Sequence, residues 1–251
     1  MPSTLTLNNR TGDLSMKQRI LFGPFRSRRL GVSLGVDIIP HKTCTFNCVY
    51  CECGSTTNLT LERREYVSLK KITEKLEYYL KKNPSLDHIT FSGSGEPTLN
   101  SKIDQIIGYI RENFPPYQVA VLTNASLLKE KEVRDSLKRA QVVIPSLNAV
   151  SPDIFERINR PHPDITSQQV ISGLIKFRRE YQGKILLEVF IVPGLNDGER
   201  ELALLRKAIE KIGPDQVQLG TLYRWGTEDW VEEADLEEME RMAAYLKGRV
   251  I

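Results

Sequence analysis

The sequence lacks the features that would place it in a membrane or on a secretory route. No stretch of its 251 residues approaches the roughly 20 apolar residues that a membrane helix needs. The N-terminus also lacks the apolar core of a signal peptide. The net charge is only +3, so composition does not require a nucleic-acid partner. We therefore expect a soluble, cytoplasmic protein that makes no contact with a membrane.

Repeats, low-complexity tracts and linkers are also missing after residue 20. With 40% hydrophobic residues, the chain is long enough for one sizeable core and fits one domain better than two. The residues before Met16 are polar and show little periodicity, and they would be dispensable if Met16 is the natural start. We expect an N-terminal extension over residues 1–20 and a single domain over residues 21–251.

Short β-rich runs alternate with stretches of helical periodicity, which is typical of a parallel sheet with crossover helices. Six strand–helix units are expected, two fewer than in a full eight-unit barrel. The predicted fold is therefore an α/β partial (βα)6 barrel with parallel strands, and in such folds the loops after the strands form the site. The expected strands cover residues 36–39, 88–91, 119–122, 142–144, 185–192 and 217–219.

Cysteine is scarce, and its placement is the most informative feature of the chain. Only four cysteines are present, and Cys44, Cys48 and Cys51 form a C-x3-C-x2-C run. Three thiolates on one tight loop can hold three corners of a cubane iron–sulfur cluster, whose irons usually need four such ligands. One iron then stays open to a substrate or cofactor, as in catalytic metal sites.

Two other interpretations of this loop remain open. The fourth cysteine, Cys53, makes a four-cysteine zinc site conceivable, although zinc sites usually bring together two well-separated ligand pairs. Plain thiols are the other alternative, since cytosolic cysteines stay reduced and disulfides are therefore poorly motivated. We favour the cluster and assign no role to Cys53.

The run C-T-F-N-C-V-Y-C, with Tyr50 before the last cysteine, resembles the cluster loop of the radical S-adenosylmethionine (radical SAM) superfamily. The strings F-G-P-F-R-S-R-R-L and G-V-S-L-G-V-D-I-I-P-H-K-T-C resemble its wyosine-synthase-related iron–sulfur oxidoreductases. The resemblance implies a [4Fe–4S] cluster on Cys44, Cys48 and Cys51, with SAM chelating the open iron. It also implies the six-unit barrel and an electron donor such as flavodoxin or ferredoxin.

A glycine-rich turn, S-G-S-G-E-P-T-L, follows the second expected strand. Gly93 and Gly95 allow close backbone approach, and the carboxylate of Glu96 can receive an ammonium group. Alone, these residues would suit any tight strand–helix turn. After a cysteine loop, the turn resembles the family motif for the SAM amino group, and we expect Glu96 to bind that group.

The other expected SAM contacts lie after later strands. Asn124, Ser146 and Asn148 stand where the family contacts the ribose and carboxylate of SAM, and Gly194 lies in a segment resembling the motif that packs around adenine. The resemblance places Tyr50 among the cofactor contacts as well. Small polar residues at strand ends are also ordinary loop formers.

Arginines and aromatic residues near the expected barrel mouth suggest a substrate site. Guanidinium groups bind phosphate or carboxylate in a forked geometry, so we expect an anionic substrate there. The alternative is that the arginines brace an N-terminal strap through salt bridges. The residues concerned are Arg28, Arg29, Arg160, Tyr223 and Trp225.

The substrate itself stays undetermined. A small molecule, a transfer RNA base or a protein partner are all compatible with the sequence, and a protein partner would make the chain a radical activase. Wyosine synthases carry a second cluster on additional N-terminal cysteines, and no cysteine precedes Cys44 here, so we do not assign that activity. An iron–sulfur electron carrier is the non-enzyme alternative, but it would have no use for an ammonium receptor. The prediction is a radical SAM enzyme that cleaves SAM reductively to a 5′-deoxyadenosyl radical, which abstracts hydrogen from the substrate.

Overall fold

The computed structural model describes residues 19–223 and 226–251, and its centre is one curved sheet. The strand order is β1-β2-β5-β6-β7-β8-β9-β10. β1 runs antiparallel to β2, whereas the neighbours from β2 to β10 are parallel. The strands are β1 (Leu21–Ser27), β2 (Gly31–Val36), β5 (His88–Phe91), β6 (Gln118–Thr123), β7 (Val142–Pro145), β8 (Lys184–Phe190), β9 (Gln216–Gly220) and β10 (Arg249–Val250).

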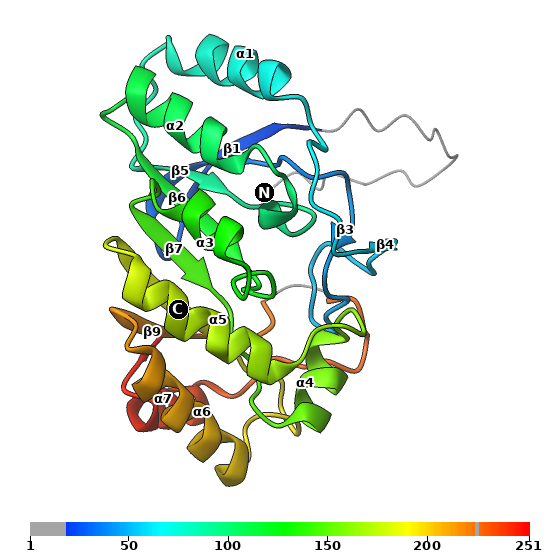
Figure 1. Cartoon of the computed structure of the whole chain (residues 1–251). Coiled ribbons are helices and arrows are strands. Elements are labelled where there is room, and N and C mark those ends of the chain that lie inside the picture. Colours follow the sequence, from blue (N-terminus) through cyan, green and yellow to red (C-terminus); the bar gives the residue numbers. More distant parts are fainter. Residues whose placement is uncertain (1–18, 224–225) are drawn as a thin grey trace, which may run out of the picture.

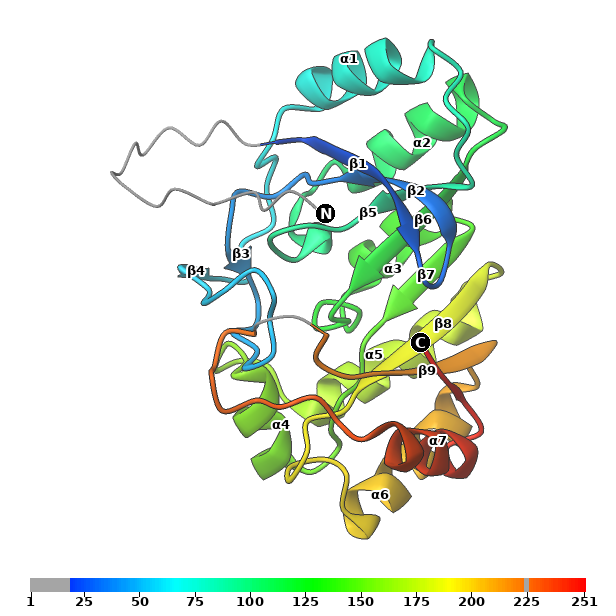
Figure 2. The same cartoon turned by 180° about the vertical axis from the view of Figure 1, so that it is seen from behind.

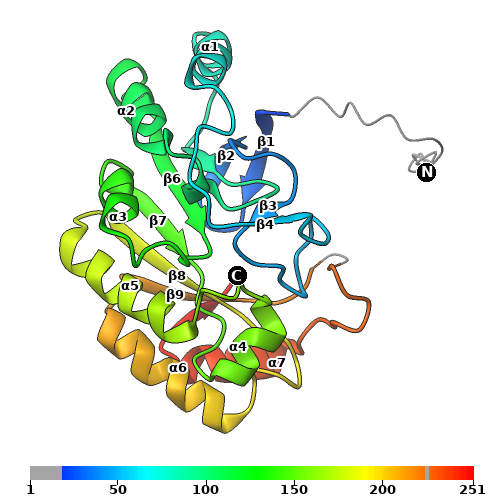
Figure 3. The same ribbon diagram turned by 45° about the vertical axis from the view of Figure 1, so that its right-hand side comes forward.

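Helices cover the convex face of this sheet and connect its parallel strands (Figures 1 and 3). Seen from behind, the hairpin of β1 and β2 lies across the opposite side of the molecule (Figure 2). A short pair of strands, β3 (Thr43–Cys44) and β4 (Asn58–Leu59), stands apart from the main sheet. The helices are α1 (Leu69–Leu80), α2 (Ile103–Asn113), α3 (Lys131–Leu137), α4 (Pro152–Asn159), α5 (Ser167–Glu180), α6 (Glu199–Ile212) and α7 (Leu236–Tyr245), with a 3-10 turn η1 (Pro97–Leu99).

The core lies between the sheet and these helices. All four residues of β7 are buried, as expected for a central parallel strand that is covered on both faces. Helix α2 turns a row of isoleucines toward the sheet, and helix α1 begins at Ser68, whose side chain accepts a hydrogen bond from Lys71 N. No helix in the described ranges combines the length and apolar character that a membrane crossing needs.

The predicted series of six strand–helix units is present, with some differences. The first parallel strand ends at Val36 rather than beginning there, because Ile38 and Ile39 pack into the core from the loop that leads to the cysteines. The short helix α4 and the edge strands β1 and β10 were not predicted. Most of the expected extension lies outside the described residues, but Ile20 is buried and its carbonyl accepts a hydrogen bond from Asp37 N.

Candidate functional site

The cysteine loop begins after β2, at the carboxyl end of the parallel strands. Cys44, Cys48 and Cys51 are partly buried, Cys53 is exposed, and all four are free thiols. Because parallel strands present their carboxyl ends at one edge of the sheet, the loops after β5, β6, β7 and β8 can meet the cysteines there.

The glycine turn after β5 packs closely against the cysteine loop. Glu96 N donates to Thr43 O at 3.2 Å, and Lys42 N donates to Ser94 O at 2.9 Å. A Cβ atom at Gly95 would lie 2.1 Å from the same Thr43 carbonyl oxygen, which no side chain can tolerate. Position 95 therefore needs glycine so that the turn can reach the backbone beside Cys44.

The carboxylate of Glu96 lies at the bottom of this turn and is almost fully buried. It accepts hydrogen bonds from Thr98 N, Thr98 Oγ1 and Thr123 Oγ1 on one oxygen, and from Asn124 N on the other. Burial raises the pKa of Glu96, and these donors oppose that shift. Glu96 thus joins the turn after β5 to the end of β6, and its second oxygen accepts one hydrogen bond whereas its first accepts three.

Each of the three spaced cysteines receives one side-chain N–H group. Asn124 Nδ2 donates to Cys44 Sγ at 3.6 Å, Asn159 Nδ2 to Cys48 Sγ at 3.5 Å, and Lys42 Nζ to Cys51 Sγ at 3.1 Å. The sequence singled out Asn124 but missed this role of Lys42 and Asn159. The available signal for Lys42 was a basic residue two positions before the first cysteine.

The thiols differ in their tendency to ionise. Burial raises the pKa of Cys44 to about 12 and that of Cys48 to about 11. For Cys51, the hydrogen bond with Cys53 and then the ammonium of Lys42 lower the pKa to about 5. One thiolate is therefore favoured at neutral pH before any metal arrives.

Tyr50 connects the cysteine loop to the ends of β7 and β8 through a ring contact and a hydrogen bond. Its ring stacks on Phe190 with centroids 4.0 Å apart, and its hydroxyl accepts a hydrogen bond from Asn148 Nδ2 at 2.6 Å. Asn148 Oδ1 in turn accepts from Phe190 N. These contacts use one N–H group and one lone pair of the Asn148 amide, and SAM contacts by Tyr50 and Asn148 stay predictions.

Ser146 and Gly194 lie at the ends of neighbouring strands. Ser146 Oγ donates to Glu188 Oε2 at 3.3 Å. Gly194 has a φ of +76°, which favours glycine, and its N–H group donates to Asp197 Oδ2. Both residues are at the carboxyl edge of the sheet, as predicted, and their contacts with SAM remain predictions.

The structure gives each of the predicted arginines a partner within the protein. The backbone of Arg28 and Arg29 precedes β2, at the end of that strand opposite to the cysteine loop. The Arg29 guanidinium pairs with Glu188, whose other oxygen accepts from Ser146 Oγ, and Arg28 donates to the carbonyl of Ile251. Arg160 lies beside the loop, because its carbonyl accepts from Asn47 N, and it pairs with Glu228.

Each of these guanidinium groups has a partner within the protein, so the expected anionic substrate site stays a prediction that requires these contacts to open. The bracing alternative agrees with the contacts. Arg28 also lies over the ring of Tyr223, 5.1 Å from its centroid, and Trp225 lies outside the described residues.

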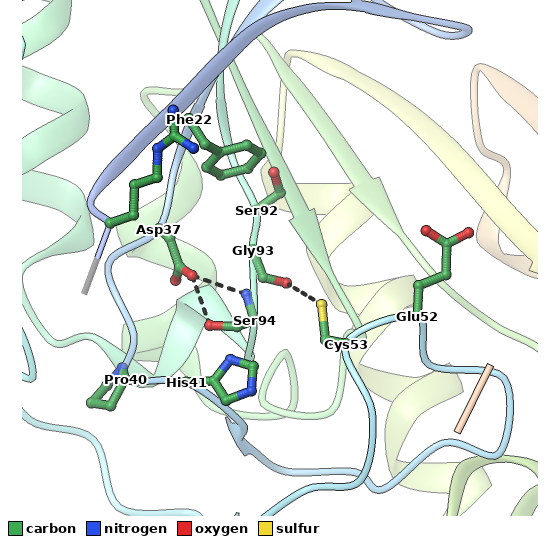
Figure 4. A pocket seen from close by; sticks show the side chains of 10 residues that line it. Phe22, Asp37, Pro40, His41, Glu52, Cys53, Ser92, Gly93 and Ser94 are labelled. Carbon is green, nitrogen blue, oxygen red and sulfur yellow. Dashed lines mark hydrogen bonds between the residues drawn. The ribbon is translucent and has the colours of Figure 1, made fainter. Parts of the chain in front are cut away.

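A cavity of about 820 Å³ adjoins the cysteine loop, which is within the range of ligand pockets. Asp37 Oδ2 accepts from both Ser94 N and Ser94 Oγ, and Cys53 Sγ donates to Gly93 O at 3.7 Å, so that the loop and the glycine turn form one wall (Figure 4). The sequence did not reveal this cavity. Its lining comprises Arg19, Phe22, Asp37, Pro40, His41, Glu52, Cys53, Ser92, Gly93 and Ser94.

The donor set fits an iron–sulfur cluster better than a single metal ion. In the described part of the chain, no three His, Cys, Asp or Glu side chains converge as ligands of one ion. A cubane takes its thiolates on different irons, so its cysteines need not converge on one point. Amide and ammonium donors beside the sulfurs suit thiolates that carry negative charge.

Comparisons with known proteins agree with this geometry. The family model of the Radical SAM superfamily matches residues 38–206. GTPase Obg of Brachyspira hyodysenteriae is 40% identical over 244 residues, which cover 97% of this chain but only 36% of that protein. A UPF0026 protein of Methanocaldococcus jannaschii is 33% identical over 227 residues, 90% of this chain and 70% of that protein. The solved structure of TYW1 with a lysine–pyruvate adduct bound has a TM-score of 0.62 at 16% identity, covering 86% of this chain and 72% of that one.

Proposed function

This chain belongs to the radical SAM superfamily of enzymes, and we propose that it holds one [4Fe–4S] cluster on Cys44, Cys48 and Cys51. The predicted family and partial-barrel fold are thereby confirmed, and TYW1, the wyosine synthase of the predicted subgroup, shares the fold. The chain spans only about a third of the GTPase Obg relative, so the activity, substrate and partners given below are proposals.

The contact between Gly95 and Thr43 carries the proposal. It places the glycine turn directly on the backbone beside the first cysteine, which supports a cofactor that contacts both the cluster and this turn. When bound, such a cluster supplies one electron that splits SAM into methionine and a 5′-deoxyadenosyl radical, which abstracts hydrogen from the substrate. The chain provides the thiolates, the glycine turn and the cavity beside them.

We assign the SAM amino group to the glycine turn and the free acceptor position of Glu96 Oε2. Ser146 lies on the carboxyl edge that the rest of the cofactor would cross, together with Asn124 and Gly194. A flavodoxin or ferredoxin is the proposed electron donor.

The substrate proposal favours a small molecule or a single nucleotide over a protein. A cavity of about 820 Å³ next to the cysteine loop has the size of a ligand pocket, whereas a protein surface would need a broad open face. The name of the GTPase relative does not extend to this chain, because its sequence contains no G-x-x-x-x-G-K-[ST] phosphate-binding loop.

Cysteine substitutions test the cluster assignment. After anaerobic reconstitution, Cys44→Ala, Cys48→Ala and Cys51→Ala should each lose the iron chromophore, since each thiolate holds one iron. Cys53→Ala is the matched control on the same loop and should retain it. Equal loss in all four variants would instead indicate a closed site with four cysteine ligands.

A further inference from the structure

Among the described residues, two of the three side chains that donate to the cysteine sulfurs are buried without the polar partners that usually accompany buried polar groups. Lys42 and Asn159 are each only 3% exposed, although burying an ammonium or an amide is costly unless it is paired. In the described part of the chain, the partner of the Lys42 ammonium is the sulfur of Cys51 rather than a carboxylate. The Asn159 amide donates to Cys48, and its Oδ1 atom is buried without a partner.

The backbone holds these donors in place. Lys42 has a φ of +56°, an uncommon conformation for a residue with a side chain, and its N–H group is bonded to the glycine turn. Asn159 ends α4, and its carbonyl accepts from Asn47 N in the cysteine loop. The Asn124 side chain is held by Thr45 Oγ1 and Ser126 N while it reaches Cys44. The donors thus come from the cysteine loop, the end of α4 and the loop after β6.

We propose that Lys42, Asn159 and Asn124 form a set of sulfur donors, one for each cluster cysteine, that raises the reduction potential of the cluster. This inference rests on the proposed function, because it requires a cluster on the three cysteines. Hydrogen bonds to the sulfurs and nearby positive charge stabilise the extra electron of a reduced cluster. Lys42 has the largest effect, since it adds a full buried charge to its N–H group, whereas Asn159 adds a dipole.

The set consists of positioning residues, since none of its members has to touch the reacting atoms. A cluster without these donors would be harder to reduce and would need a stronger electron donor. The donors would therefore match the cluster to a biological reductant such as a reduced flavin or another iron–sulfur protein.

A potentiometric titration followed by electron paramagnetic resonance tests the proposal without using turnover. Lys42→Met removes the charge and the donor while keeping the length of the side chain, and Asn159→Leu removes the second donor at similar size. Both variants should shift the midpoint potential of the reconstituted cluster to more negative values, and the shift should be larger for Lys42→Met. Lys42→Arg, which keeps the charge, should recover most of the potential.

Lys70→Met is the matched control, because Lys70 is exposed on α1 and pairs with Glu74 across 3.8 Å. Loss of this screened surface charge should leave the potential unchanged. Unchanged potentials in Lys42→Met and Asn159→Leu at full iron content would overturn the inference. So would failure of both Lys42→Met and Lys42→Arg to take up iron, since the lysine would then only hold the loop. A wild-type protein that assembles no cluster would instead contradict the proposed function itself.

Discussion

Substitution of Gly95 by alanine probes the contact between the glycine turn and the cysteine loop. The added Cβ would lie 2.1 Å from Thr43 O and 2.7 Å from Ile39 Cγ2, so the two segments would have to move apart by about 1 Å. A shift of this size breaks or weakens two hydrogen bonds, from Glu96 N to Thr43 O and from Lys42 N to Ser94 O. It also moves the backbone that carries Cys44.

The magnitude follows from these two effects. Overpacking costs about 1–3 kcal/mol, and two weakened hydrogen bonds add about 1–3 kcal/mol. The free energy of unfolding should thus fall by about 2–6 kcal/mol. In a domain of this size, where 1 kcal/mol shifts the melting temperature by about 2–4 °C, that corresponds to a decrease of about 4–24 °C.

Thermal unfolding of the metal-free protein, followed by circular dichroism, measures this loss, and iron analysis after reconstitution measures the effect on the loop. We expect Gly95→Ala to melt earlier and to bind less iron. The control is Gly198→Ala, where an added Cβ meets nothing within 4 Å, and it should change stability by less than about 1 kcal/mol with full iron content. A Gly95→Ala protein with the melting temperature and iron content of the wild type would refute the argument.

Two further predictions concern buried charges. Burial raises the pKa of the Glu96 carboxyl in the folded protein above its ordinary 4.5. The protonated carboxyl therefore contributes stability that is fully present below pH 4.5 and is lost as the pH rises through the pKa of the folded protein. Urea unfolding between pH 4.5 and 8 should therefore show that the wild type loses stability relative to Glu96→Gln as the pH rises, and a constant difference would contradict the shift. Arg29→Met should lower the free energy of unfolding by about 1–3 kcal/mol. Breaking a fully buried ion pair costs about 3–5 kcal/mol, and the loss is smaller here because the Arg29 and Glu188 side chains are 18% and 16% exposed. Adding Glu188→Gln to Arg29→Met should recover most of that loss, because it removes the unpaired carboxylate. No recovery would show that the two side chains do not stabilise the protein as an ion pair.

The sequence was sufficient to predict the succession of parallel strands and helices along the chain and the position of the cysteine loop. The continuous apolar run of β7 and the helically spaced isoleucines of α2 are visible within a few neighbouring residues, so they could be assigned from the sequence alone. The first strand was predicted too late in the chain. Ile38 and Ile39 are apolar, like residues of a buried strand, but they are buried in the loop after β2. Helix α4 was missed because it has only eight residues, although Ser151 followed by Pro152 is an ordinary helix start.

The partners of the polar residues could not be predicted, because they come from distant parts of the chain. Glu188 lies 159 residues from Arg29 and Glu228 lies 68 residues from Arg160, so nothing local showed that these arginines are already paired. The sulfur donor Asn159 similarly lies 111 residues from Cys48. Periodicity and motif spacing reveal which strand end a residue follows, but not which side chain it meets there.

Reductive cleavage of SAM tests the central claim most directly. Anaerobically reconstituted protein, with its iron content measured, is reduced with dithionite in the presence of SAM, and the products are separated by chromatography. We predict equal amounts of methionine and 5′-deoxyadenosine, formed slowly without substrate and lost in Cys48→Ala. Methylthioadenosine as the only product, or no cleavage by a reduced protein with full iron content and bound SAM, would contradict the account.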